Sequence, residues 1–309
     1  MWAMVRGKEV YRPKRVFAVA LEPAKGVKKK GKKRGRPPIY PDHLYIALLV
    51  LRSYYNWTYR ETEAFFRDLF PDQPCPSFQA LHWYMRVKLG EEELVKLLEL
   101  LRERLGPFLE EDSLLILDST GIAHRGKSQK LGWMRGRFPR VVRGHVRLCL
   151  AVRYFRGKRL LLPVGMSVGG GYAPDPVLGA KALSTADSGG VLLADAGFDS
   201  GRVYREAEGR FSPMIRLKGG GEVRDEKRRE VLEAFRPELY RLRAVGEGVF
   251  GALKTRLNGR LRNLLPSHTQ KDALLLVVCY VLRVFLALLR LLFGPLFRRP
   301  IRGMVPAFC

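Results

Sequence analysis

Two short apolar runs, each ending in an aspartate, constrain the fold of this chain more than any other feature. The run Leu114–Leu117 is followed by Asp118 and the run Val191–Ala194 by Asp195, with small residues next in both places. Short, continuously apolar runs are typical of strands buried on both faces of a sheet. Polar groups just past such strands are where α/β sheets place their chemistry. The pattern predicts an α/β domain with both aspartates as candidate site residues, although an aspartate there also commonly caps a turn.

Further strands and a helix complete the expected α/β domain. The expected strands cover residues 146–154 and 159–168, joined by a hairpin turn at 156–158, and residues 214–217, with Pro213 at the strand's edge. Asp175, between two prolines, is the expected N-cap of a helix that runs to about Leu183. Residues 218–236 are rich in glycine and then in charge, which predicts a mobile connection.

The stretch from Tyr240 to Lys254 predicts a helix that gathers several chemically distinct side chains. Because residues three, four and seven apart share a helix face, the polar members of one stripe are Tyr240, Arg243, Glu247 and Lys254. A carboxylate with a guanidinium one turn before it and an ammonium two turns after it can hold a metal ion beside a phosphate. Taken alone, Arg243 and Glu247 also read as an ordinary surface pair, worth a few tenths of a kcal/mol.

The two strand-end aspartates and Glu247 together supply three carboxylates. Mg²⁺ and Mn²⁺ prefer oxygen ligands and leave coordination positions for water and phosphate. Two such ions roughly 3.5–4 Å apart activate the attacking oxygen and stabilise the leaving oxygen of an in-line displacement at phosphorus. Arg243 and Lys254 would contact phosphates or steady Glu247. Mg²⁺ is therefore the expected cofactor, with Mn²⁺ as a substitute.

The charge of the chain indicates a polyanionic partner. Its 309 residues include 56 lysines and arginines against 30 acids, a formal net charge of +26. Such an excess is typical of proteins that bind nucleic acid or an anionic membrane surface. The four cysteines and five histidines show neither a disulfide framework nor zinc-ligand spacing, which favours a reducing cytosol. No signal peptide is expected. Residues 271–293 are apolar but are interrupted by Arg283 and Arg290, which favours a buried packing helix over a membrane span.

The N-terminal third divides into a basic arm and a helical region. Residues 1–40 hold thirteen lysines and arginines against two acids and predict a flexible arm. Within it, Arg34 and Arg36 form an AT-hook-like Arg-Gly-Arg-Pro segment, which binds phosphates non-specifically or enters an A·T minor groove. Residues 41–110 predict helices, with a capping box at Thr58. These helices suit a helix-turn-helix module or a dimerisation bundle equally. If the region reads DNA, the residues to suspect are Gln79, His82, Trp83 and Arg86.

A second basic segment, residues 125–143, lies between the first two strands. It contains Trp133, Arg135 and Arg137, and aromatic rings among cations suit base stacking and phosphate contact. The alternative is a disordered loop.

The motifs resemble those of the DDE transposases of prokaryotic insertion sequences, in the branch with the Y-x2-R-x3-E-x6-K signature. Tyr240, Arg243, Glu247 and Lys254 match all four positions of that signature. Asp118 stands in the family-like context LDST and Asp195 in the context ADAGFDS, with 76 residues between the aspartates and 51 between Asp195 and Glu247. The chain departs from the family at Gly246 and Gly248, where a bulky residue usually precedes the glutamate. The helix is therefore expected to begin near Glu247 or to be irregular there.

The resemblance implies a fold and a reaction. The fold is an RNase H-like mixed sheet flanked by helices, preceded by an all-helical DNA-binding or dimerisation region. The reaction is Mg²⁺-dependent cutting at terminal inverted repeats, followed by attack of the 3′-hydroxyl on target DNA. Asp118, Asp195 and Glu247 would be the catalytic metal ligands. DNA would be bound by the remaining candidates, Tyr240, Arg243, Lys254, Arg34, Arg36, Trp133, Arg135 and Arg137.

The expected organisation and partners follow from these assignments. The domains are the arm (1–40), the helical region (41–110), the catalytic domain (111–295) and a basic tail (296–309). The partners are double-stranded DNA, as inverted repeats and target, and a second copy of the chain on DNA. No membrane is expected, and the location is the cytoplasm, at the prokaryotic nucleoid. The alternatives are a non-catalytic DNA-binding derivative and an RNase H-like metal-dependent nuclease.

Overall fold

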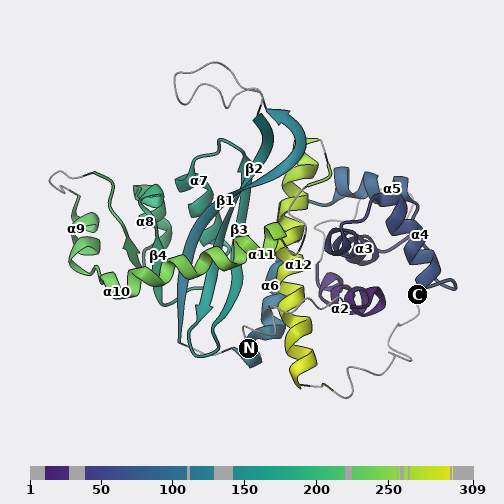
Figure 1. The fold of residues 1–309 in the computed structure, drawn as a ribbon, viewed down its shortest axis with the longest axis horizontal. Helices are drawn as coiled ribbons and strands as arrows, with labels where there is room; N and C mark the ends of the chain where they lie inside the picture. The colour runs from purple at the N-terminus through teal and green to yellow at the C-terminus, as the bar shows by residue number, and fades with distance from the viewer. Residues whose placement is uncertain are drawn as a thin grey trace. The chain divides into compact units, whose positions relative to one another are not determined.

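The chain divides into two compact units. The computed structural model describes residues 11–27, 39–109, 112–128, 142–219, 225–255, 257, 261–263, 265–292 and 294 (Figure 1). One unit is Phe108–Leu274, and the other combines Trp2–Pro107 with Leu275–Cys309. This division differs from the expected catalytic domain at 111–295, because the last part of the C-terminal helix belongs to the N-terminal unit.

The N-terminal unit is helical in its described residues. Its elements are α2 (Pro13–Lys25), α3 (Asp42–Tyr55), α4 (Tyr59–Leu69), α5 (Phe78–Trp83), the π-helix η1 (Tyr84–Lys88), α6 (Glu91–Leu105) and the later part of α12 (Pro266–Leu292). The prediction of a flexible arm is wrong for Pro13–Lys25. This helix starts at a proline and buries Phe17, Leu21 and Ala24 on one face, which the surrounding charge conceals in the sequence.

Local sequence signals set the helix ends in this unit. Asn56 ends α3 in the left-handed conformation, with φ of 55°. Thr58 and Glu61 form the expected capping box at the start of α4. Ser77 caps α5 by accepting a hydrogen bond from the amide of Ala80. The predicted capping box at Thr58 is confirmed, and all three signals depend only on residues a few positions apart.

The other unit contains a five-stranded mixed sheet. Its strands are β1 (Ser113–Ser128), β2 (Val142–Phe155), β3 (Leu160–Gly170), β4 (Val191–Ala194) and β5 (Ser212–Ile215), in the order β3-β2-β1-β4-β5. The pairs β1–β2 and β2–β3 are antiparallel, whereas β1–β4 and β4–β5 are parallel. The predicted fold class, a mixed sheet flanked by helices and preceded by helices, is confirmed. Pro213 lies in β5, the edge strand, where its missing amide hydrogen does least harm.

Helices cover both faces of the sheet (Figure 1). The helices of this unit are α7 (Asp175–Ser184), η4 (Ala196–Phe198), α8 (Gly201–Ala207), α9 (Glu226–Glu233), α10 (Pro237–Tyr240), the 3₁₀-helix η5 (Arg241–Gly246) and α11 (Glu247–Thr255). One face of β1, β4 and β5 packs on the segment from α9 to η5, through an apolar cluster that includes Ile116, Leu193 and Leu242. The opposite face carries α7, since Gly179 lies against Leu117.

Several expected boundaries are corrected. β1 does not end at Asp118 but continues to Ser128, because β2 pairs with it along that length. Asp175 is the first residue of α7 rather than its N-cap, which is Pro174. The predicted mobile connection over 218–236 contains the helix α9. β5 starts and ends two residues before the predicted strand.

A buried arginine fastens the connection that leads into β4. Arg153 of β2 is 4% exposed and is paired with the carboxylate of Asp187. Its other nitrogens donate to the carbonyl oxygens of Asp187, Ser188 and Gly189. A buried guanidinium is tolerated where its donors are satisfied, as they are here. This arrangement fixes the start of β4, and through it the level at which β4 ends.

Helix α12 carries the most apolar segment of the described residues. By length and composition it could cross a membrane, but 72% of its most apolar window is buried in the structure. In the N-terminal unit, the Cys279 thiol donates to the carbonyl of Val50 on α3. This burial is what the expected packing helix requires.

The junction of η5 and α11 approaches the sheet closely at Gly246. A Cβ atom on this glycine would stand 2.8 Å from Cγ2 of Ile116 on β1. That methyl group belongs to a β-branched side chain with little freedom to move. The lack of a side chain at Gly246 therefore lets the backbone segment that carries Glu247 lie directly on the strand that carries Asp118.

We expect Gly246→Ala to lower the free energy of unfolding by about 1–3 kcal/mol, because the added methyl overpacks a close backbone approach. Urea denaturation followed by circular dichroism measures it. Gly251→Ala is the matched control, since Gly251 is on α11 and a methyl group added there would meet no atom within 4 Å. The control should be neutral or stabilising by up to about 1 kcal/mol. Equal effects of the two substitutions would contradict the close approach.

Candidate active site

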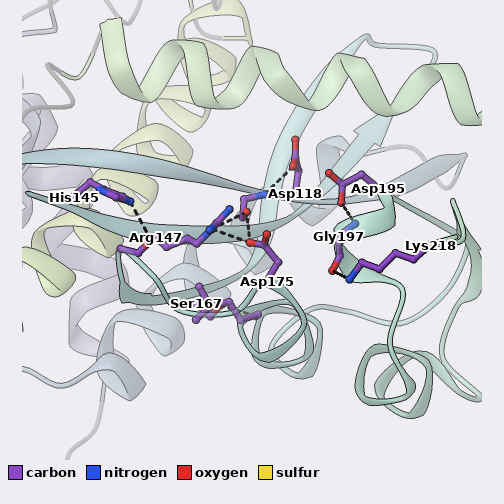
Figure 2. A network of polar contacts seen from close by, with 11 residues as sticks. Asp118, His145, Arg147, Ser167, Asp175, Asp195, Gly197 and Lys218 are labelled. Atoms are coloured by element: carbon purple, nitrogen blue, oxygen red, sulfur yellow. Dashed lines mark hydrogen bonds and ion pairs between the residues drawn. The ribbon is translucent and has the colours of Figure 1, made fainter. Parts of the chain in front are cut away.

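The parallel pairing of β1 and β4 brings the two predicted aspartates together. The last paired residues are Leu117 and Ala194, so the next residues are Asp118, which continues β1, and Asp195, which follows the end of β4. Side chains alternate in direction along a strand, and residues in register on neighbouring strands point to the same face of the sheet. The backbone therefore directs both aspartates to the same face. Figure 2 shows the two carboxylates near each other, just past the last pair of β1 and β4. The register of β1 and β4 therefore places the two aspartates side by side, although β1 continues past Asp118.

The segment Tyr240–Lys254 lies on the face of β1 to which Asp118 belongs. Arg243 Nη1 is 3.5 Å from Asp118 Oδ2. Lys254 Nζ donates to Thr120 Oγ1 at 2.6 Å, two residues further along β1. In the sequence, Glu247 lies between Arg243 and Lys254, and its negative charge raises the pKa of Asp118. The contacts of Arg243 and Lys254 thus hold the segment that carries Glu247 against β1.

The single continuous helix expected over Tyr240–Lys254 is not present. The chain passes from α10 through the 3₁₀-helix η5 into α11, and α11 begins at Glu247, as the flanking glycines indicated. In a 3₁₀-helix, residues three apart align along one face. Tyr240, Arg243 and Gly246 are therefore in line above β1. Glu247 and Lys254, seven apart, share a face of α11.

Asp118 sits in an environment that disfavours its charge. Its side chain is 17% exposed, and burial is the main cause that raises its pKa above the ordinary value of 3.8. The negative charges of Asp195 and Glu247 raise it further. The Ser119 amide, 2.8 Å from Asp118 Oδ1, and the Arg243 guanidinium act in the opposite direction. A divalent cation would relieve this repulsion, because it interacts favourably with all three carboxylates at once.

Tyr240 supports the guanidinium that faces Asp118. Its ring packs on Phe235, with ring centroids 5.0 Å apart. Burial raises the pKa of Tyr240, and Arg243, which hydrogen-bonds the phenol, lowers it. In this structure Tyr240 therefore steadies Arg243.

The loop that follows Asp195 is held by a buried carboxylate that the sequence analysis assigned no role. Asp199, with its side chain 2% exposed, accepts hydrogen bonds from the Tyr204 hydroxyl, the Lys218 amide and the Arg228 guanidinium. Lys218 Nζ also donates to the carbonyl of Gly197, whose amide donates to Asp195 Oδ1 (Figure 2). The motif ADAGFDS contained the signal, a second acid four residues after the first. Its partners come from distant segments, so their convergence could not be read from the sequence.

A second missed group lies on the other face of β1. Asp175 pairs with Arg147 and accepts a hydrogen bond from the Ser119 hydroxyl. Sequence reasoning noted Asp175 only as a helix cap.

The remaining predicted DNA-binding residues fall outside the described residues. These are Arg34, Arg36, Trp133, Arg135 and Arg137. In the N-terminal unit, Gln79, Trp83 and Arg86 are exposed on α5 and η1. Across the parts of the chain that are described, no three His, Cys, Asp or Glu side chains stand close enough together to hold a metal ion as they are placed.

The raised pKa of Asp118 gives a pH-dependent prediction. The folded state holds the proton of Asp118 more tightly than the unfolded state does, so ionisation at neutral pH opposes folding. We expect Asp118→Asn, assayed without metal, to be more stable than the wild type at pH 7. The difference should shrink as the pH falls through the raised pKa and vanish below 3.8.

Urea unfolding at several pH values measures this difference. Glu230→Gln, at an exposed position on α9, serves as the control and should show no such pH-dependent gain. An Asp118→Asn protein that is less stable than the wild type at pH 7 would contradict the assignment of burial as the dominant cause.

Comparisons with known proteins bear directly on this arrangement. A family model described as "Transposase DDE domain" matches residues 109–282. An uncharacterised protein of Aquifex aeolicus (strain VF5) is 33% identical over 148 residues, which cover 47% of this chain and 44% of that protein. The match thus spans less than half the length of this relative. No solved structure matches the chain significantly. Since the family match covers more than half of the chain and includes Asp118, Asp195 and Glu247, the chain belongs to the transposase DDE domain family.

Proposed function

We propose that this protein is a DNA transposase that cuts at the terminal inverted repeats of an insertion sequence and joins the 3′-hydroxyl ends to target DNA. The observation that carries the proposal is that Asp118 and Asp195 directly follow the last pair of the β1–β4 ladder, and that the charges of Asp195 and Glu247 both act on Asp118. The family to which the chain belongs supports DNA as the substrate.

The three carboxylates are the proposed ligands of Mg²⁺, for which Mn²⁺ can substitute. An all-oxygen donor set suits these hard cations. The raised pKa of Asp118 supports this assignment, because a bound cation would stabilise the negative charge that burial and the neighbouring carboxylates disfavour. Glu247 is exposed at the first residue of α11, and we expect its side chain to change rotamer on metal binding, since the carboxylates as placed do not form a complete ligand set. When bound, two such ions would activate the attacking oxygen and stabilise the leaving one.

The reaction consists of two displacements at phosphorus. In the first, water attacks the phosphodiester at the element's end, a new P–O bond forms, and the element's 3′-oxygen leaves as a hydroxyl. In the second, that 3′-oxygen attacks a target phosphodiester, and the target's own 3′-oxygen leaves. No covalent enzyme intermediate is needed. The protein's own contribution is to position the phosphate and to supply the negatively charged carboxylates of Asp118 and Asp195.

The basic side chains have distinct proposed roles. Arg243 is occupied by Asp118 and Tyr240, so it positions the carboxylate. Lys254 is exposed and lies beside Thr120, where its ammonium can meet a DNA phosphate. The net charge of +26 supplies the general attraction for DNA. Because two element ends must be held together, we propose a homodimer on DNA.

We expect Asp195→Asn to abolish metal-dependent nicking of a labelled duplex that carries the element's own terminal repeat. The loss should be at least about a hundredfold, because several kcal/mol of charge stabilisation in the transition state disappear. An asparagine oxygen can still accept the hydrogen bond from Gly197, so the loop and DNA binding should persist. Asp112→Asn, at an exposed residue that pairs with Arg156, removes the same charge away from the site and should cut normally.

The products separate the proposal from its alternatives. Nicked ends that become joined to a second DNA support a transposase, and cutting without joined products indicates a metal-dependent nuclease. Binding without cleavage in both the wild type and Asp195→Asn would indicate a non-catalytic DNA-binding protein.

A further inference from the structure

A compact polar network lies behind the candidate active site, on the face of β1 opposite to Asp118. Asp175 Oδ1 accepts a hydrogen bond from Ser119 Oγ at 2.5 Å and lies 2.8 Å from Arg147 Nε. Arg147 Nε is also 3.4 Å from Ser119 Oγ. Figure 2 shows Arg147 and Asp175 pointing toward each other near Asp118. Three elements, β1, β2 and α7, contribute one residue each.

The register of β1 and β2 explains why the three residues meet. Ser119 pairs with Cys149 and Gly121 pairs with Arg147, so Ser119 and Arg147 are diagonal neighbours on one sheet face. Asp175, at the start of α7, is placed below both. Asp118 is adjacent to Ser119 in the strand and therefore points to the opposite face.

Helix α7 is fastened to the sheet, so Asp175 is held on a rigid element. Ser167 of β3 donates to the carbonyl of Leu178 at 2.6 Å and is 5% exposed. A Cβ on Gly179 would stand 2.7 Å from Phe198 and 3.2 Å from Leu117, which shows how closely the helix lies. The connection before α7 is tied to β2 as well, because His145 Nε2 is 3.0 Å from the carbonyl of Gly171.

The network reaches the candidate metal ligand through one residue. The Ser119 amide donates to Asp118 Oδ1 at 2.8 Å, while the hydroxyl of the same serine is held by Asp175. β1 has no β4 partner beyond Leu117, so at this point the β4 side of the strand is not braced by the ladder. We propose that Asp175 is a positioning residue that, through Ser119, fixes Asp118 for metal binding. The inference rests on the proposed function of Asp118.

A purely structural role makes a different prediction. An acid in the first turn stabilises a helix through its dipole, and a partly exposed ion pair adds little to stability. Loss of Asp175 would then lower stability and leave the metal affinity of a folded protein unchanged. Loss of a positioning group instead weakens the metal affinity, since groups that orient ligands typically contribute 10–100-fold to it.

The test measures binding of Mn²⁺ alone to the full chain by electron paramagnetic resonance, beside thermal unfolding. We expect Asp175→Ala and Ser119→Ala each to weaken Mn²⁺ binding about tenfold or more. The double variant should bind Mn²⁺ no more weakly than the single variant with the lower affinity, because both residues act on Asp118 along one path. Asp175→Asn keeps an acceptor for Ser119 and should have an intermediate effect, and it preserves the test if Asp175→Ala fails to fold. Glu206→Gln breaks a comparably exposed ion pair with Arg210 on α8 and should bind Mn²⁺ as the wild type does.

The outcomes separate this inference from the proposed function. Folded Asp175 and Ser119 variants with wild-type Mn²⁺ affinity would overturn the positioning role and leave the transposase proposal intact. A wild-type protein that neither binds Mn²⁺ nor cuts DNA would overturn both. The positioning role is supported if the variants need a higher Mn²⁺ concentration for half-maximal nicking but reach the wild-type rate at saturating Mn²⁺.

Discussion

The parallel pairing of β1 with β4 is the constraint on which the rest of this protein depends. The register Leu117 to Ala194 ends both apolar runs at the same level, and the two aspartates follow together. Had either strand slipped by one residue, one aspartate would point to the opposite face of the sheet. The chain secures this register from outside the site. Arg153 fixes the connection that leads into β4, and the long β1–β2 ladder holds the other strand beyond Asp118.

Concentrating carboxylates at that edge has a physical cost that the surrounding residues offset. Asp118 is partly buried and faces two further negative charges, which raise its pKa. The positive charge of Arg243 partly offsets this repulsion at Asp118, and Tyr240 holds Arg243 in place. The loop after Asp195 is fastened through the buried Asp199. The two aspartates are thus held in place by contacts from outside the site, while their charges are only partly compensated.

Local sequence patterns predicted local structure well, and they failed where contacts decided the outcome. The apolar run at Val191–Ala194 is β4, and the capping box at Thr58 opens α4. The glycines that flank Glu247 indicated where α11 begins. The helix Pro13–Lys25 was missed because a general excess of lysine and arginine hid one apolar face. β1 was predicted too short because a polar, small-residue segment can still form strand when a neighbour pairs with it.

The sequence by itself determined which residue types are available and in what order: two strand-end aspartates, a glutamate at a helix start and basic residues on either side of it. These follow from periodicity, capping and spacing, which act over a few residues. Only the tertiary structure decided that Gly246 is needed for the close approach to Ile116, and that Asp175, Ser119 and Arg147 meet behind Asp118. Those facts depend on the register of strands and the packing of helices far apart in the chain, and no local pattern encodes the distance between them.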